Sequence, residues 1–345
     1  MDQEIYAAAK PHLLGLLEVI REPSSVTSEF VSEACSALGQ WFEARGHLRC
    51  AVDFALAAYF AVPRSAGHAA RVGRLLRMLA EYPRSISWYD YAIYVARQSR
   101  DWLAYTEALA GLGNLHFQIG NLPRARHFHR RCLRTASRSH LPEMVGGAYH
   151  NLFVLEMDAG NIELAETFAQ KAFATYGPSS PYLVRLARDL SRRWTVLGHF
   201  ERSLPLACET LHHFSAPVDL ALVWADIARA AGGAGRRAEF EDAWAEAWVL
   251  VKRGVAVSVA ADVLIDLARG AGSLAELPRA AHAASRALAI ASERKEGRTI
   301  LEAEALIESF HLPKQNGLPL TTTAPEPELG GDILRALREL RAVAA

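Results

Sequence analysis

Small turn residues recur along this chain at nearly constant spacing, each between two apolar helical segments. Their separations are 34, 40, 40 and 38 residues, for Gly46, Ala80, Gly120, Gly160 and Gly198. Glycine tolerates the left-handed backbone that ends many helices, so it is the expected residue at such turns. One helix pair cannot bury its apolar face alone, so repeats of this length must stack on their neighbours. The sequence therefore predicts an all-α solenoid of about seven antiparallel helix pairs.

The repeat is clearest between Leu112 and Leu133. Small residues at Gly113 and Ala125 would let two antiparallel helices approach closely, with Gly120 supplying the turn between them. Apolar residues then follow at helical spacing on the second helix, at Ala125, Phe128, Cys132 and Leu133. The same order of small and apolar positions recurs around the other turns.

These positions resemble tetratricopeptide repeats, in particular the longer-looped bacterial kind found in sensor and regulator proteins. The resemblance covers roughly residues 30–293 and weakens beyond Pro217, where the turn at residues 232–235 is expected to be overlong. It implies a right-handed superhelix. In that superhelix the first helix of each pair lines a concave groove, and the second helix forms the outer surface.

The solenoid is expected to occupy residues 29–311, with flanking segments on either side. Residues 1–28 predict an N-terminal capping helix, and residues 295–311 predict another cap that hides the last apolar face. Residues 312–331 are rich in Pro, Thr and Gly, which is typical of a flexible linker.

Residues 332–345 predict a short C-terminal amphipathic helix. Asp332 can cap its start, and its apolar side consists of Ile333, Leu337 and Leu340. We expect this helix to dock on an apolar outer edge of its own solenoid or on a partner.

Composition limits the classes of function. The chain is 51% hydrophobic and 22% charged, as expected for a folded protein. The 38 basic and 38 acidic residues balance, so a general attraction to nucleic acid or anionic membrane is not expected. There is no run of 18 apolar residues, and the acidic first residues differ from a signal peptide. A cytoplasmic location is therefore expected.

No arrangement of residues predicts catalysis or a cofactor. Phosphate-binding loops and the HExxH, CxxC and GxSxG motifs are missing from the sequence. Asp262 and Asp266 are expected on a solvated helix face, with a metal site as the weaker alternative. The cysteines are expected to be reduced and buried on apolar faces, at Cys35, Cys50, Cys132 and Cys208.

Histidines and arginines in residues 124–138 are expected on a solvated surface. His127 and His129 lack the spacing and carboxylate support of a metal site. One stripe of this helix is basic but carries no interleaved aromatic residues for base stacking, so direct nucleic-acid binding is not expected. The stripe consists of His127, Arg131, Arg134 and Arg138.

The register of the first helices selects residues that should face the groove. Two arginine groups at helical spacing bracket a neutral centre with two asparagines. Arginine forks can hold carboxylates, and in peptide-binding proteins of the resembled kind inward asparagines hold a peptide backbone. Alternatively, these arginines pair with neighbouring acids such as Asp189 and Glu107. The predicted partner-binding residues are Arg71, Arg74, Arg77, Asn114, Phe117, His150, Asn151, Arg185, Arg188 and Arg192.

The expected function is a non-catalytic scaffold or sensor that captures a protein or peptide segment, including an acidic one, in its groove. The alternative is a ligand-sensing regulatory subunit of a bacterial transcription or signalling system. Such a subunit would act through a separate DNA-binding or effector protein, because about 20 residues before the first repeat are too few for a DNA-binding domain. The sequence leaves open whether the chain forms a homodimer.

Overall fold

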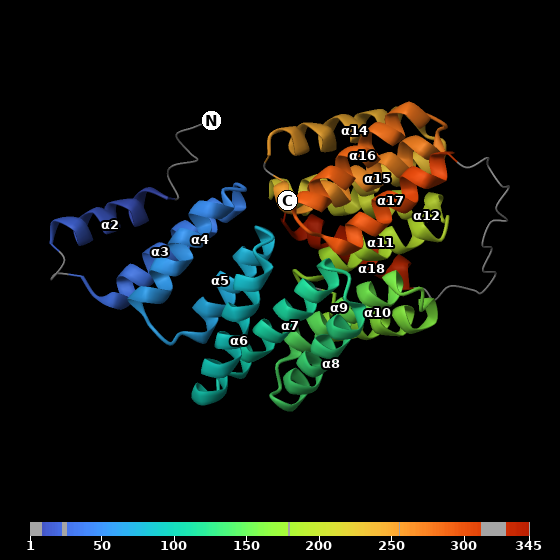
Figure 1. Cartoon of the computed structure of the whole chain (residues 1–345). Coiled ribbons are helices and arrows are strands. Elements are labelled where there is room, and N and C mark those ends of the chain that lie inside the picture. Colours follow the sequence, from blue (N-terminus) through green and yellow to red (C-terminus); the bar gives the residue numbers. More distant parts are fainter. Residues whose placement is uncertain (1–8, 23–25, 179, 255, 312–328, 345) are drawn as a thin grey trace. The chain divides into compact units, whose positions relative to one another are not determined.

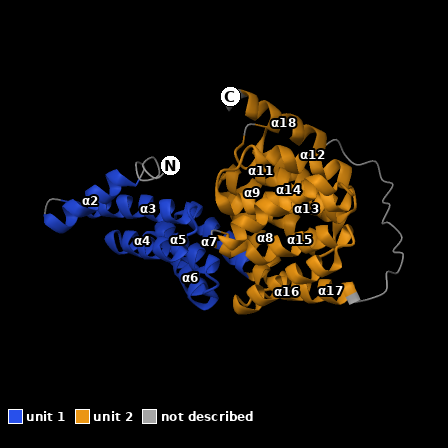
Figure 2. Cartoon of the chain, turned by 90° about the horizontal axis from the view of Figure 1, so that it is seen from above, with its two compact units in different colours: residues 1–115 blue, residues 116–345 orange. Residues whose placement is uncertain are grey.

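The structure, a computed structural model, describes residues 9–22, 26–178, 180–254, 256–311 and 329–344. Throughout these residues the regular structure is helical, without strands, which confirms the all-α prediction. The chain divides into two compact units, residues 1–115 and 116–345 (Figures 1 and 2).

Unit 1 holds two antiparallel helix pairs and the helix that precedes them. The helices are α2 (Lys10–Arg21), α3 (Ser28–Ala44), α4 (Leu48–Ala61), α5 (Ala66–Met78) and α6 (Tyr82–Ser99). Each pair packs along its length, α3 on α4 and α5 on α6, while α2 lies against α3. The next helix, α7 (Trp102–Gln118), crosses the boundary between the two units.

Small residues let the helices of unit 1 approach closely, as the repeat pattern predicts. Tyr89 is 1% exposed and packs against Gly73 and Gly111, where an added Cβ would lie 3.0 and 2.3 Å from the tyrosine ring. Ser85 donates a hydrogen bond from Oγ to the Gly73 carbonyl at 2.7 Å. Larger side chains at these positions would force Tyr89 out of the core.

Unit 2 contains four complete pairs together with α8 and two terminal helices. Consecutive helices from α8 to α17 pack on each other. Counting α7 and α8, which follow one another in the chain, as a further pair gives the seven pairs expected. The helices are α8 (Leu122–Arg138), α9 (Pro142–Asp158), α10 (Ile162–Tyr176), α11 (Leu183–Val196), α12 (Phe200–Leu211), α13 (Pro217–Gly233), α14 (Arg237–Lys252), α15 (Ala260–Ser273), α16 (Leu277–Glu293), α17 (Gly297–His311) and α18 (Leu329–Ala344).

All five expected turn residues have left-handed backbone. Their φ angles are 80, 61, 85, 76 and 80° at Gly46, Ala80, Gly120, Gly160 and Gly198. Gly235 and Ala275 continue the series in the C-terminal half, with φ of 74 and 62°. The helix pairs therefore stay regular where the sequence pattern weakens.

The expectation of an overlong turn at residues 232–235 is wrong. Helix α13 extends through Gly233, and only Gly235 takes the left-handed turn conformation. Gly232 is instead a packing residue, because an added Cβ would lie 2.4 Å from the Gly270 carbonyl oxygen on α15. Two glycines thus let the backbones of α13 and α15 meet.

Helix α17 was expected to be a cap, but it also contacts the start of unit 2. Gln118 donates from Nε2 to Glu296 Oε1 at 2.9 Å. Gly297 lies so close to Ile119 that an added Cβ would be 2.6 Å from the Ile119 carbonyl oxygen. The beginning of α17 therefore joins the α7–α8 turn, and the first helices of unit 2 surround a common space.

The C-terminal helix α18 docks on α11 and α12 of its own chain. Ile333 and Leu337 are fully buried there, and Arg341 Nη1 lies 3.2 Å from Glu209 Oε1. The helix begins at Leu329, three residues earlier than expected, and Gly330 in its first turn packs against Trp194 of α11. Of the expected linker, residues 312–328 lie outside the described residues.

Gly330 fixes the start of α18, and a larger side chain there should release the helix. An added Cβ would lie 2.0 Å from Trp194 Cη2, whereas one at Gly331 would meet nothing within 4 Å. We expect Gly330→Leu to weaken docking by about 1–3 kcal/mol through overpacking. Hydrogen exchange of residues 333–340 measures the effect, with Gly331→Leu as the control. Equal protection of α18 in the two variants would contradict this packing.

Two expectations about side-chain burial are wrong. Cys35 and Cys132 are buried as expected, but Cys50 and Cys208 are exposed. His129 is 1% exposed rather than on the surface, because it follows Ala125 by one helical turn and shares that residue's buried face. His127, the neighbouring histidine on this helix, is exposed as expected.

The buried His129 should make the chain sensitive to mild acid. Burial lowers the pKa of His129 from 6.5 to about 4, so the folded chain keeps the imidazole neutral. The unfolded chain protonates it below about pH 6.5, so stability is lost as the pH falls from 6.5 to about 4. This residue should contribute a loss of about 3 kcal/mol. The free energy of unfolding of His129→Leu, measured in urea, should not show this loss between pH 6.5 and 4. The same pH dependence in the variant as in the native chain would refute the role of His129.

Candidate partner-binding site

Unit 2 holds a cavity of about 680 Å³ among the first helices of its pairs. Its lining comes mainly from α9, α11, α13, α15 and α17, with further residues from the α7–α8 turn. None of the described residues of α10, α12, α14 or α16 lines it. Ligand pockets typically measure about 300–1,000 Å³, so the cavity is large enough to accept a ligand.

One wall of the cavity is apolar. Phe153, Val154 and Met157 of α9 contribute to it, together with Val196 at the end of α11 and Leu301 on α17. Val196 is 52% exposed and Leu301 is 68% exposed, although both face the cavity. An occupant that covered them would gain roughly 25 cal/mol for each Å² of apolar surface removed from water.

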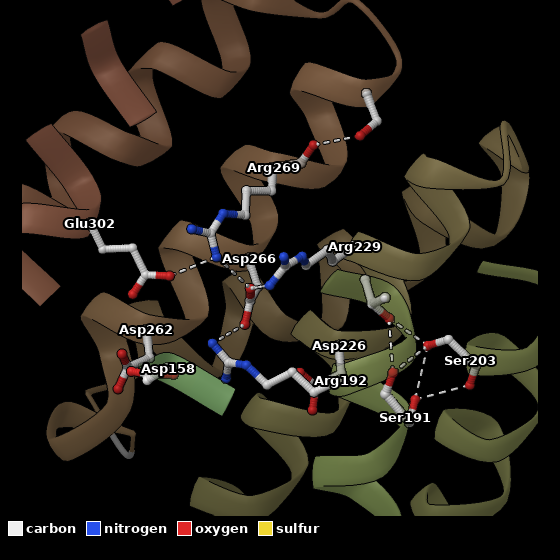
Figure 3. A network of polar contacts seen from close by, with 12 residues as sticks. Asp158, Ser191, Arg192, Ser203, Asp226, Arg229, Asp262, Asp266, Arg269 and Glu302 are labelled. Carbon is white, nitrogen blue, oxygen red and sulfur yellow. Dashed lines mark hydrogen bonds and ion pairs between the residues drawn. The ribbon is translucent and has the colours of Figure 1, made fainter. Parts of the chain in front are cut away.

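Three arginines that line the cavity converge on Asp266 (Figure 3). The Asp266 carboxylate lies 3.2 Å from Arg192 Nη2, 2.7 Å from Arg229 Nη1 and 3.8 Å from Arg269 Nη1. The Asp266 side chain is 1% exposed, so the expectation of a solvated face is wrong. Burial raises the pKa of Asp266, but the three guanidinium groups together hold that pKa below its usual range.

Three carboxylates in turn converge on Arg298 of α17. The guanidinium lies 2.6 Å from Asp262 Oδ1, 3.0 Å from Glu302 Oε2 and 3.4 Å from Asp158 Oδ2. Burial lowers the pKa of Arg298, but these carboxylates outweigh burial and raise the pKa above its ordinary value. Glu302 also lies 2.7 Å from Arg269 Nη1, which links this cluster to the arginines around Asp266.

A third group of ion pairs lies on α9, α11 and α13. Arg188 Nε donates to Asp226 Oδ2 at 2.7 Å, and His150 Nε2 lies 2.8 Å from Asp189 Oδ2. Burial raises the pKa of Asp189, but Arg188 and His150 lower it to about 2. Asp189 is therefore a carboxylate at neutral pH.

The predicted residues of unit 2 do not all lie at the cavity. Phe117, Arg188 and Arg192 line it. His150 is engaged with Asp189, and Arg185 is 62% exposed at 3.8 Å from Asp219. Asn151 is half-buried and does not line the cavity. The pairing of arginines with acids, the alternative interpretation of the sequence, describes the environment of Arg188 and Arg192.

The other predicted residues belong to unit 1. Glu43 lies 3.1 Å from Arg71 Nη2 and 2.6 Å from Arg74 Nη1, so these arginines are also paired. Arg77 lies on the same helix, and Asn114 is half-buried on α7. The ten predicted residues therefore divide between the two units.

Sequence reasoning missed the contribution of α17 to the cavity. Arg298, Leu301 and Glu302 are three and four residues apart, which places them on one helix face. That spacing was visible in the sequence. Because this helix was expected to be a cap, its polar face was not considered as part of a site.

No group of three or more His, Cys, Asp or Glu side chains in the part of the chain that the structure describes is arranged to hold a metal ion. None of the described helices combines the length and the apolar character needed to cross a membrane.

No protein-family model matches the sequence, and no curated protein matches it either. Solved structures do resemble the fold. A Rap protein complexed with competence and sporulation factor has a TM-score of 0.65 at 14% identity, covering 82% of this chain and 80% of that chain. The apo form of RapI gives 0.56 at 11% identity, covering 81% and 99%. A chain of the APC/C hetero-tetramer Cut9–Hcn1 gives 0.52 at 15% identity, covering 89% and 55%.

At these identities the likeness concerns the fold alone. The chain is a tetratricopeptide-like helical-repeat solenoid, which confirms the resemblance inferred from the turn spacing.

Proposed function

We propose that the chain is a non-catalytic binding protein that captures a peptide or protein segment in the cavity of unit 2. The observation that carries the proposal is the exposure of Val196 and Leu301 within this cavity. These apolar side chains are exposed to water in a cavity whose charged residues are ion-paired. A ligand with apolar groups of its own would cover them and is therefore favoured. The Rap structure that resembles the chain is described as a complex with competence and sporulation factor, which supports a binding role by analogy of fold.

Phe117, Arg188 and Arg192 are the predicted residues that would contact the segment. Arg71, Arg74, Arg77 and Asn114 remain candidate binding residues of unit 1 taken by itself. We also propose the cytoplasmic location that the sequence predicts.

The regulatory alternative is favoured by the position of α17. This helix carries Leu301 at the cavity and, at its start, Gly297 against Ile119. An occupant that displaced α17 would therefore also disturb its contact with the α7–α8 turn. A sensor built in this way would pass the signal to a separate effector protein.

Leu301→Glu tests the capture site. Leu301 is largely exposed, so the substitution should change the free energy of unfolding by no more than about 0.5 kcal/mol. It should lower retention of bound segments by at least about tenfold, because it removes apolar contact and adds a carboxylate beside Glu302. Val249→Glu is the matched control, since Val249 is 40% exposed on α14 and lies outside the cavity.

The measurement uses the immobilised full chain and a randomised pool of short peptides with blocked termini. Mass spectrometry of the retained peptides gives the retention of each variant relative to the native chain. Equal retention by Leu301→Glu and Val249→Glu would refute the cavity as the capture site.

A further inference from the structure

The charges at the cavity fall into two halves, one around Asp266, which is not itself a lining residue, and one around Arg298. In one half, three guanidinium groups surround the single carboxylate of Asp266, so positive charge is in excess. In the other half, three carboxylates surround the single guanidinium of Arg298, so negative charge is in excess. The Arg269–Glu302 ion pair joins the two halves across 2.7 Å (Figure 3).

Each half keeps hydrogen-bonding capacity toward the cavity. In the described structure, the one ion pair of Arg192 is with Asp266, whereas a guanidinium carries five N–H groups. Asp158 is 35% exposed, and the described structure pairs it with Arg298 alone. Both side chains line the cavity. A ligand carboxylate can therefore bind beside the arginines, and a ligand cation beside Asp158 and Asp262.

The apolar wall limits the ligand further. Val154, Met157 and Leu301 contact the same space as the two charged halves. A ligand that satisfies all three surfaces carries an acidic group, a basic group and an apolar portion. A ligand with only one sign of charge leaves the opposite half desolvated without a partner, which is unfavourable.

We propose, building on the proposed function, that the cavity recognises a short dipolar peptide segment that carries one acidic and one basic side chain with apolar residues beside them. The acidic side chain lies against Arg192 and Arg269, and the basic one against Asp158 and Asp262. This choice differs from a purely acidic partner, because a second acidic side chain would lie against the half where negative charge is in excess around Arg298.

The test compares peptide pools on the immobilised full chain. Four pools of blocked peptides share the same random apolar positions and carry one Glu and one Lys, two Glu, two Lys, or two Gln. We expect the Glu/Lys pool to be retained about tenfold more than the Gln pool, and more than either pool with one sign of charge. A Gln pool with free termini tests whether the charged amino and carboxyl termini of a peptide can replace the Lys and Glu side chains. Retention of this pool above the blocked Gln pool would support the dipolar preference.

Two variants test which half of the cavity binds the acidic side chain and which binds the basic one. Arg269→Gln leaves Asp266 with two arginines and should remove the preference for Glu, while Asp158→Asn leaves Arg298 with two carboxylates and should remove the preference for Lys. Each variant should keep the other preference. Arg236→Gln removes an arginine from an exposed ion pair outside the cavity and should change neither.

The outcomes separate this inference from the proposed function. Equal retention of all pools, lost in Leu301→Glu, would overturn the dipolar preference and leave capture in the cavity intact. Stronger retention of the two-Glu pool would also overturn it. Retention of no pool would contradict both the inference and the proposed function.

Discussion

Asp266→Asn should lower the free energy of unfolding of unit 2 by about 3–5 kcal/mol, the range for breaking a buried ion pair. The neutral amide no longer balances Arg192, Arg229 and Arg269, which lie 3.2, 2.7 and 3.8 Å from the carboxylate. The side chains of these arginines are 23, 12 and 27% exposed, so water replaces the lost charge only in part. Asp266 thus links α11, α13 and α15 through its three arginine partners.

Urea-dependent hydrogen exchange of α11, α13 and α15 measures this loss without averaging over unit 1. Glu201→Gln is the control, because it removes a carboxylate from an exposed pair in the same unit, 2.6 Å from Arg236. The control should leave stability nearly unchanged, since exposed ion pairs contribute little. Equal stability of the two variants would mean that the arginine cluster does not need Asp266.

Gly232→Val should destabilise unit 2 by about 3 kcal/mol or more, at the upper end of overpacking penalties. An added Cβ at this position would lie 2.4 Å from the Gly270 carbonyl oxygen and 2.7 Å from its Cα. The obstacle is backbone on both sides, so no side-chain rotation can relieve it. The helices α13 and α15 must separate, and the core between them loses contact along its length.

Gly147→Val is the matched control for this substitution. Gly147 also lies inside a helix, but an added Cβ would meet only Tyr176 Oη at 3.8 Å. The Gly147→Val substitution should leave the free energy of unfolding nearly unchanged, because valine is a somewhat better helix former than glycine. Thermal unfolding with hydrogen exchange on α13 and α15 compares the two variants. A similar small effect for both would show that the glycine contact is not a close one.

The helix pairs could be predicted from the sequence because their turns are local. A small residue at the end of a first helix takes the left-handed backbone, and this holds even for Ala80, with φ of 61°. The buried face of a second helix was equally readable, and extending the period from Ala125 would have placed His129 on it. Where the helical period alone decides which side chains are buried, the sequence is sufficient to predict their burial.

The charge clusters could not be predicted residue by residue, since an aspartate on a helix normally faces water. A signal existed at the repeat length, however. Arg188 and Asp226 are 38 residues apart, Arg229 and Asp266 are 37 apart, and each pair links neighbouring first helices. Residues of opposite charge that lie one repeat length apart in the sequence therefore indicate ion pairs between neighbouring first helices rather than solvated helix faces.

The return of α17 to the α7–α8 turn lay beyond any local pattern. Gln118 and Glu296 are 178 residues apart, and their contact depends on the summed rotation of all the pairs between them. Small rotations in each pair decide whether such a contact forms. The sequence pattern sets the pairs but not their accumulated rotation, and for this reason the contribution of α17 to the cavity was missed.

Hydrogen exchange of the full chain, with and without the most strongly retained peptide at saturation, tests the capture site most directly. We predict slower exchange at residues 153–158 of α9 and 298–302 of α17, with α14 and α16 unchanged. Slower exchange confined to α14, α16 or unit 1, with those two cavity segments unaffected, would contradict it.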